Sequence, residues 1–65
     1  MHDTKWVQHA LNTLGIDGTP LVEDGSYGRH TARVVREYQA RQGLTVDGLA
    51  GPHTIAQLEK DTAHA

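Results

Sequence analysis

An internal repeat is the feature that most constrains how this chain can fold. Residues 24–31, Asp-Gly-Ser-Tyr-Gly-Arg-His-Thr, align with residues 47–54, Asp-Gly-Leu-Ala-Gly-Pro-His-Thr, and five of the eight positions are identical. The apolar flanks repeat too, since Leu21 and Leu44 are separated by the same 23 residues as the two motifs. We therefore interpret the two segments as copies of one loop-to-helix unit, and we expect them to fold alike.

Each copy of the motif indicates a tight turn followed by a helix. Asp can hydrogen-bond the backbone that follows it, and glycine tolerates a positive φ, so the Asp-Gly pair favours a turn. Pro52 is typical of the first helical position, which makes Gly51, and by the repeat Gly28, the residue before a helix. The carboxylates are expected to close the turn onto the helix N-terminus, and the threonine hydroxyls to reach back toward it. We predict structural roles for Asp24, Gly25, Gly28, Thr31, Asp47, Gly48, Gly51 and Thr54.

Apolar residues with helical spacing predict three helices. Their expected ranges are about 4–14, 29–42 and 52–60. Gly15 and Gly43 follow the first two, where glycine is the usual left-handed terminator. Residues 16–28 indicate a structured loop, and residues 61–65 a frayed tail. The expected fold is all-α, a compact three-helix bundle in which residues 1–65 form a single domain.

Size and charge limit the function classes. A chain of 65 residues without cysteine has no disulfide and no Cys-based zinc site, so packing alone must stabilise it. Six Lys and Arg against eight Asp and Glu do not suggest a strongly basic nucleic-acid binder. No apolar run approaches the roughly 20 residues of a membrane span. The N-terminus lacks the order of a signal peptide, so any export is expected to be arranged elsewhere.

The sequence also argues against metal binding and catalysis. With Gly25 at position six of a calcium loop, Pro20 and Val22 would occupy ligand positions, so the Asp-Gly motif does not fit calcium. A β-hairpin at the motif could only be minimal, because the flanks are short. Glu23 and Asp24 are neighbours whose side chains diverge, which is unlike the facing carboxylates of a glycosidase. The five histidines contain no helical i, i+4 pair. We expect binding without catalytic residues, metal or cofactor.

Taken in order, the motifs resemble the peptidoglycan-binding domain type 1 family over about residues 4–60. Beside the two repeats, the resemblance rests on Val7-Gln8, Leu11-Asn12-x-Leu14-Gly15, Val34-Val35-x-x-Tyr38-Gln39 and Gly43-Leu44-x-Val46. Tyr38 stands where Phe is usual, and the segment 16–23 is somewhat long. The resemblance implies a three-helix module that attaches endolysins, autolysins or peptidases such as zinc carboxypeptidases to bacterial peptidoglycan. It implies action at the cell wall, a catalytic hydrolase domain in the same or a partner chain, and neither membrane nor nucleic acid as partner.

A binding surface is predicted around the first copy of the motif. Sugars present apolar C–H faces, which aromatic rings contact well. Tyr27 stands where the second copy has Ala50, so the fold does not demand an aromatic ring there, although the ring could instead pack on the first helix. Arg29 and His30 follow at a helix N-terminus, which suits the carboxylates of stem peptides. We predict that the ligand, glycan or stem peptide, lies near Tyr27, Arg29 and His30.

Two other function classes stay open. One is a protein-interaction module that docks a partner enzyme. The other is a three-helix nucleic-acid binder, because Arg29, Arg33 and Arg36 form a basic stripe on the predicted second helix. Glu37 interrupts the neighbouring face, and few amide or hydroxyl groups accompany the arginines to read bases.

Overall fold

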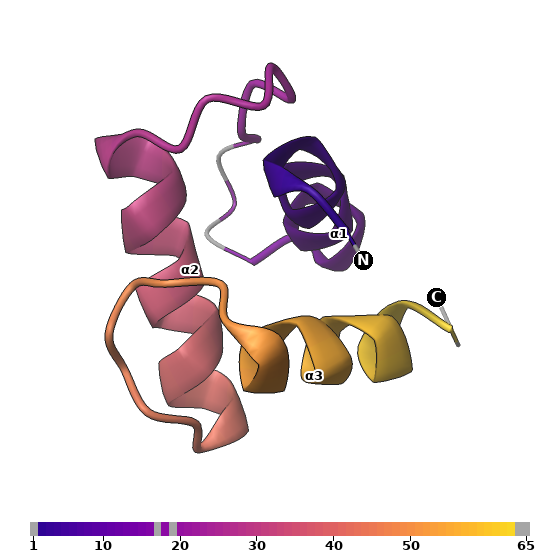
Figure 1. Ribbon diagram of the computed structural model, residues 1–65, viewed down its shortest axis with the longest axis vertical. Helices are drawn as coiled ribbons and strands as arrows, with labels where there is room; N and C mark the ends of the chain where they lie inside the picture. Colours follow the sequence, from indigo (N-terminus) through magenta and orange to yellow (C-terminus); the bar gives the residue numbers. More distant parts are fainter. Residues whose placement is uncertain (1, 17, 19, 64–65) are drawn as a thin grey trace.

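The computed structural model describes residues 2–16, 18 and 20–63. These residues form three helices and no strand. The helices are α1 (Thr4–Leu14), α2 (Arg29–Gln42) and α3 (Pro52–Thr62). In Figure 1, α1 lies beside the upper half of α2, and α3 begins beside the lower half of α2. Helix α1 contacts both other helices. The predicted all-α three-helix fold is confirmed.

Local signals set the ends of the first two helices as predicted. The Asp3 carboxylate accepts a hydrogen bond from the Trp6 N–H at 3.0 Å, which caps the start of α1. Gly15 and Gly43 adopt left-handed conformations, with φ of 65° and 70°, at the ends of α1 and α2. Only glycine adopts this conformation without a steric penalty. The ends of α1 and α2 are therefore set locally, by the glycine that follows each helix.

The third helix is longer than predicted. It continues through Asp61 and Thr62, so the expected end at residue 60 and the expected fraying from residue 61 are wrong for these two residues. The Asp61 carboxylate accepts a hydrogen bond from the Tyr38 hydroxyl at 2.6 Å, and this contact with α2 holds the last turn in place. Residues 64 and 65 of the predicted tail lie outside the described residues.

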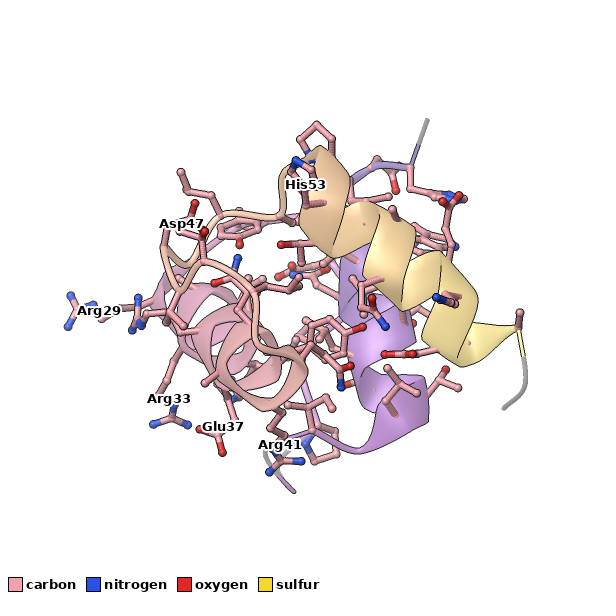
Figure 2. The ribbon with its side chains drawn as sticks, turned by 90° about the horizontal axis from the view of Figure 1, so that it is seen from below. Arg29, Arg33, Glu37, Arg41, Asp47 and His53 are labelled. Carbon is pink, nitrogen blue, oxygen red and sulfur yellow. The ribbon has the colours of Figure 1, made fainter. Side chains whose placement is uncertain are left out.

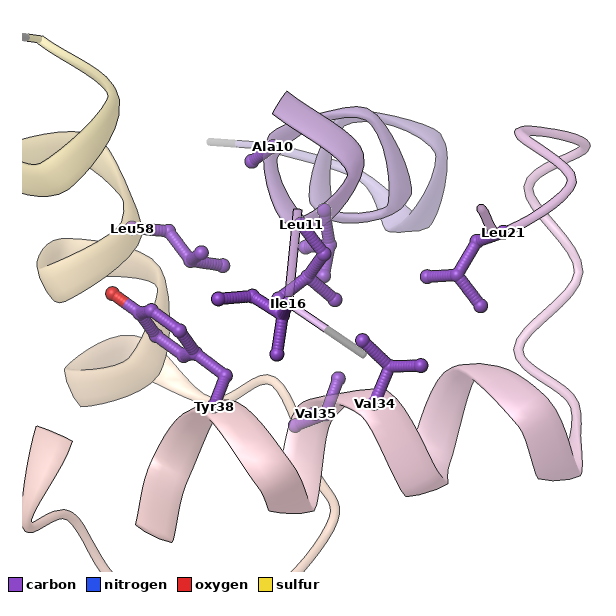
Figure 3. Close-up of a cluster of buried hydrophobic side chains, with 9 residues drawn as sticks. Ala10, Leu11, Ile16, Leu21, Val34, Val35, Tyr38 and Leu58 are labelled. Carbon is purple, nitrogen blue, oxygen red and sulfur yellow. The ribbon is translucent and has the colours of Figure 1, made fainter. Parts of the chain in front are cut away.

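The core lies between the three helices and is small. Tyr38 and Leu58, both 0% exposed, pack from α2 and α3, and Ile16 lies among the core side chains in Figure 3. The core consists of Val7, Ala10, Leu11, Ile16, Leu21, Val34, Val35, Tyr38 and Leu58. Four polar side chains are buried as well, namely Gln8, Thr31, Gln39 and Thr54. Because buried polar groups need hydrogen-bond partners, these four identify where the loops attach to the helices.

Candidate functional site

Gln8 of α1 holds the first Asp-Gly turn against α2. Its Oε1 atom accepts a hydrogen bond from the Gly25 N–H at 2.9 Å. Its Nε2 atom donates to the Ser26 carbonyl at 3.0 Å and to the Thr31 hydroxyl oxygen at 3.1 Å, with a longer contact of 3.4 Å to Asp24. One buried side-chain amide therefore joins α1, the first loop (residues 20–28) and the first turn of α2.

Gln39 of α2 does the same for the second loop (residues 44–51). Its Oε1 atom accepts from the N–H groups of Asp47 at 3.1 Å and Gly48 at 3.0 Å. Its Nε2 atom donates to the Asp47 carboxylate at 2.9 Å, the Leu49 carbonyl at 3.0 Å and the Thr54 hydroxyl oxygen at 3.1 Å. Helix α2 thus ends one unit, α1–loop–α2, and begins the next, α2–loop–α3.

The two aspartates act within their own turns. Asp24 accepts from the Ser26 N–H, and Asp47 from the Leu49 N–H, both at 2.9 Å. They reach the helices through the glutamine amides, which in turn donate to the threonines, rather than through the helix N–H groups that the sequence suggested. The physical reason is that the N–H two residues on lies nearer to each carboxylate than the helix does.

These hydrogen bonds make the stability of the fold depend on the ionisation of the two aspartates. The bond from the Ser26 N–H lowers the pKa of Asp24 below its ordinary value of 3.8, and the bond from the Leu49 N–H does so for Asp47. As the pH falls below about 3.8, the unfolded chain binds protons at these positions before the folded chain does, which favours unfolding. The ionised carboxylates therefore stabilise the fold above that pH, and this stabilisation is lost in acid.

We expect the urea midpoint of the protein to fall between about pH 5 and pH 3 and to fall less in the double variant Asp24→Asn, Asp47→Asn. The asparagine Oδ1 atoms can accept the same hydrogen bonds but do not titrate. Glu23, whose pKa is also lowered, accounts for part of the remaining slope. Equal slopes in the two proteins would show that the turn aspartates do not govern acid stability.

Asn12 fixes the beginning of the first loop. Its Oδ1 atom accepts from the Leu21 N–H at 2.7 Å, and its Nδ2 atom donates to the Leu21 carbonyl and to Glu23, both at 2.9 Å. The bond from Asn12 lowers the pKa of Glu23, and His9 lies 3.0 Å from the same carboxylate. Glu23 is therefore engaged in holding the loop on α1.

Tyr27 lies where the two loops meet. Its hydroxyl donates to the Gly48 carbonyl in the second loop, and burial raises the pKa of this hydroxyl. The side chain remains 37% exposed. It lines a depression of about 470 Å³ formed with the start of α1, the second loop and the start of α3. The ring thus joins the loops and is also open to solvent on one side.

Arg29 and His30 lie elsewhere, at the start of α2. They line a depression of about 240 Å³ against the first loop. On the outer face of α2 they also line a depression of about 340 Å³ with Arg33 and Arg36. Figure 2 shows Arg29 and Arg33 projecting from α2 away from the other two helices. The structure therefore brings Arg29 and His30 together, whereas Tyr27 lines a different depression.

Gln8 and Gln39 are the residues whose importance the sequence analysis missed. They are 31 residues apart, while the Asp-Gly motifs are 23 residues apart, so no single period aligns both. The available signal was a glutamine directly after a residue of the apolar stripe, in Val7-Gln8 and in Tyr38-Gln39. An amide on the buried side of an amphipathic helix requires partners from outside the helix.

A metal-binding cluster and a membrane-spanning helix are both absent from the described part of the chain. No three His, Asp or Glu side chains there are grouped so that they could hold a metal ion. None of the described helices combines the length and the apolar character needed to cross a bilayer.

Comparison with known proteins identifies the family. Residues 2–58 match the family model described as "Putative peptidoglycan binding domain". The chain is 51% identical over 60 residues, 92% of its length, to 18% of the spore cortex-lytic enzyme of Halalkalibacterium halodurans. It is 39% identical over 59 residues, 83% of its length, to 23% of the zinc D-Ala-D-Ala carboxypeptidase of Streptomyces albus G. None of the solved structures compared with the chain gives a significant match.

The chain thus spans about a fifth of the length of these relatives. The family model covers the two Asp-Gly turns, their glutamines, α1, α2 and the larger part of α3. A family model that covers residues 2–58 accounts for nearly the whole described fold. The chain belongs to the peptidoglycan-binding domain family.

Proposed function

We propose that this chain is a noncatalytic module that binds bacterial peptidoglycan and anchors an associated hydrolase to the cell wall. The family match over residues 2–58 is the observation that carries the proposal. It is supported by the two relatives, which are named as a lytic enzyme and a carboxypeptidase and which extend far beyond the matched segment. The catalytic partner would lie in the same chain or in another.

The chemistry of the three acidic side chains in the two loops supports a noncatalytic role. Asp24 and Asp47 accept hydrogen bonds that hold the turns, and one bond from Asn12 holds the Glu23 carboxylate. Their pKa values are lowered, mainly because of these bonds, so they stay ionised at neutral pH. A general acid for glycan or peptide hydrolysis needs a raised pKa instead.

For the ligand we propose contacts with Tyr27, Arg29 and His30. Arg29 is exposed in the first turn of α2, where the helix N–H groups add to its positive charge. Carboxylates of the stem peptides suit this position, because a guanidinium can bind a carboxylate through two parallel hydrogen bonds. The exposed side of the Tyr27 ring, in the separate depression that it lines, offers an apolar surface for a sugar or a peptide methyl group.

We expect the folded protein to sediment with purified peptidoglycan sacculi at low salt, and Arg29→Ala to bind at least about tenfold more weakly, since a charge-assisted hydrogen bond contributes about 1.5–3 kcal/mol. Arg41→Ala is the matched control. It removes a cation from the opposite end of α2, where Arg41 lies 3.3 Å from Glu37 (Figure 2).

A folded wild-type protein that stays in the supernatant at low salt would overturn the proposed function. Equal weakening by Arg29→Ala and Arg41→Ala would leave only a general charge effect and would remove Arg29 from the site. Capture of a partner enzyme without any binding to sacculi would identify a docking module instead.

A further inference from the structure

The second loop forms a depression that repeats the one at the first loop. Apart from Gln8, every residue that lines the depression of Arg29 and His30 has its repeat counterpart, 23 residues on, among the residues that line a depression of about 460 Å³ at the second loop and the start of α3. His30 corresponds to His53, and Gln8 corresponds to Gln39 in the hydrogen-bond network. The repeat has therefore duplicated a concave surface as well as a turn.

The two depressions differ in chemistry at their rims. Arg29 of the first corresponds to Pro52 in the second, and Ser26 corresponds to Leu49. No Lys or Arg is among the residues that line the second depression. Leu49 is 64% exposed, and a leucine so exposed in a small domain presents an apolar surface to a ligand.

The polar groups of the second depression are also suited to a neutral ligand. His53, labelled at the start of α3 in Figure 2, is exposed and can donate or accept a hydrogen bond. Asp47 is already engaged by the Leu49 N–H and by Gln39. The surface thus combines an exposed leucine, a proline ring and an imidazole, which fits the C–H face and acetamido group of an N-acetylated sugar better than a carboxylate.

The two depressions are held at a fixed spacing. Thr31 lines the first and Gln39 the second, and both lie on α2, where eight residues correspond to about 12 Å of helix rise. The hydrogen bond from Tyr27 to the Gly48 carbonyl joins the two loops directly. The shared helix and this hydrogen bond therefore fix the two surfaces relative to one another.

We propose that the second depression, around Leu49 and His53, is a further binding site for the same wall polymer, and that it takes an uncharged N-acetylated sugar unit while the first takes stem-peptide carboxylates. This inference rests on the proposed function. Peptidoglycan repeats both chemical groups along its strands, so one module could engage it at two points. The second contact is then intramolecular, and it raises the affinity for sacculi well above that for a soluble fragment.

The direct test is a titration of the ¹⁵N-labelled protein with a peptide-free oligomer of N-acetylglucosamine. We expect the amide resonances of Thr45 and His53, which line the second depression but not that of Tyr27, to shift, and those of Arg29 and His30 to stay in place. A soluble stem peptide is expected to give the opposite pattern. Glycan-induced shifts confined to the first loop, or no shifts at all in a protein that sediments with sacculi, would overturn the second site.

A variant pair gives a second readout, which is interpreted together with the titration because Leu49 also lines the depression of Tyr27. Leu49→Ser introduces the residue of the first copy, and we expect it to weaken sedimentation with sacculi at least fivefold at an unchanged melting temperature. Val46→Ser is the matched control, because Val46 is a 52% exposed side chain of the same loop that does not line the depression. Leu49→Ser that binds like Val46→Ser would contradict the inference.

The two proposals fail in distinguishable ways. A wild-type protein that does not sediment with sacculi removes the proposed function and the second site together. A wild-type protein that sediments, loses binding with Arg29→Ala and keeps it with Leu49→Ser retains the function and loses only the second site.

Discussion

Replacing Gln39 with leucine is expected to leave the chain largely unfolded at 37 °C. The variant removes the acceptor of the Asp47 and Gly48 N–H groups and the donor to the Leu49 carbonyl. Among the partners of Gln39, the Gly48 N–H and the Thr54 hydroxyl are buried, and each buried polar group left without a partner costs about 1–3 kcal/mol. The whole stability of a 65-residue domain is about 3–10 kcal/mol, at 0.05–0.15 kcal/mol per residue. Thermal melts followed by circular dichroism measure the loss.

Gln42→Leu is the matched control for this prediction, because it makes the same chemical change one turn further along α2, at an exposed side chain. Its contact with Gln57 is long, at 3.4 Å, and solvent-exposed, so we expect a change within about 0.5 kcal/mol. If Gln39→Leu melted at the same temperature as Gln42→Leu, the glutamine network would not be what attaches the second loop to α2.

The second large effect is expected from Leu58→Ala, with a loss of about 2–5 kcal/mol. Leu58 is 0% exposed, and Thr54 is the other buried residue of α3. Figure 3 shows the Leu58 side chain directed into the core near Tyr38. The truncation leaves a cavity at the main apolar anchor of α3, so this helix and the second loop should open before α1 and α2 do. Urea unfolding measures the loss, and amide hydrogen exchange shows where the chain opens.

Lys60→Ala supplies the control, because Lys60 is exposed in the same helix two residues further on. We expect it to change the free energy of unfolding by less than about 0.5 kcal/mol. Uniform loss of exchange protection across all three helices in Leu58→Ala would mean that α3 does not open separately.

The helices could be predicted because their signals are local. The bounds of α1 and α2 follow from apolar residues at helical spacing and from the two glycines that end them, and each signal lies within a few residues of its effect. The predicted end of α3 was wrong by two residues because the contact that holds its last turn is not local. The hydrogen bond that extends it comes from Tyr38, which lies 23 residues away in sequence.

Only part of the candidate site could be predicted from local sequence signals. The repeat located both turns. Arg29 and His30 lie together because they are consecutive residues in the first turn of α2. Tyr27, however, is directed toward the Gly48 carbonyl, 21 residues away, and so faces a different depression. Which way a half-exposed ring turns depends on the second loop, and no pattern around residue 27 contains that information.

The sequence by itself determined the helices, their apolar faces and the duplicated turns, because these depend on backbone preferences and on spacing within one segment. Only the tertiary structure decided how the units join. Gln8 and Gln39 each bind a turn and a threonine that lie 8 to 23 residues away, and α2 carries both the threonine bound by Gln8 and Gln39 itself. Such bonds form only after the helices have packed, since a buried amide finds its partners in three dimensions and not along the chain.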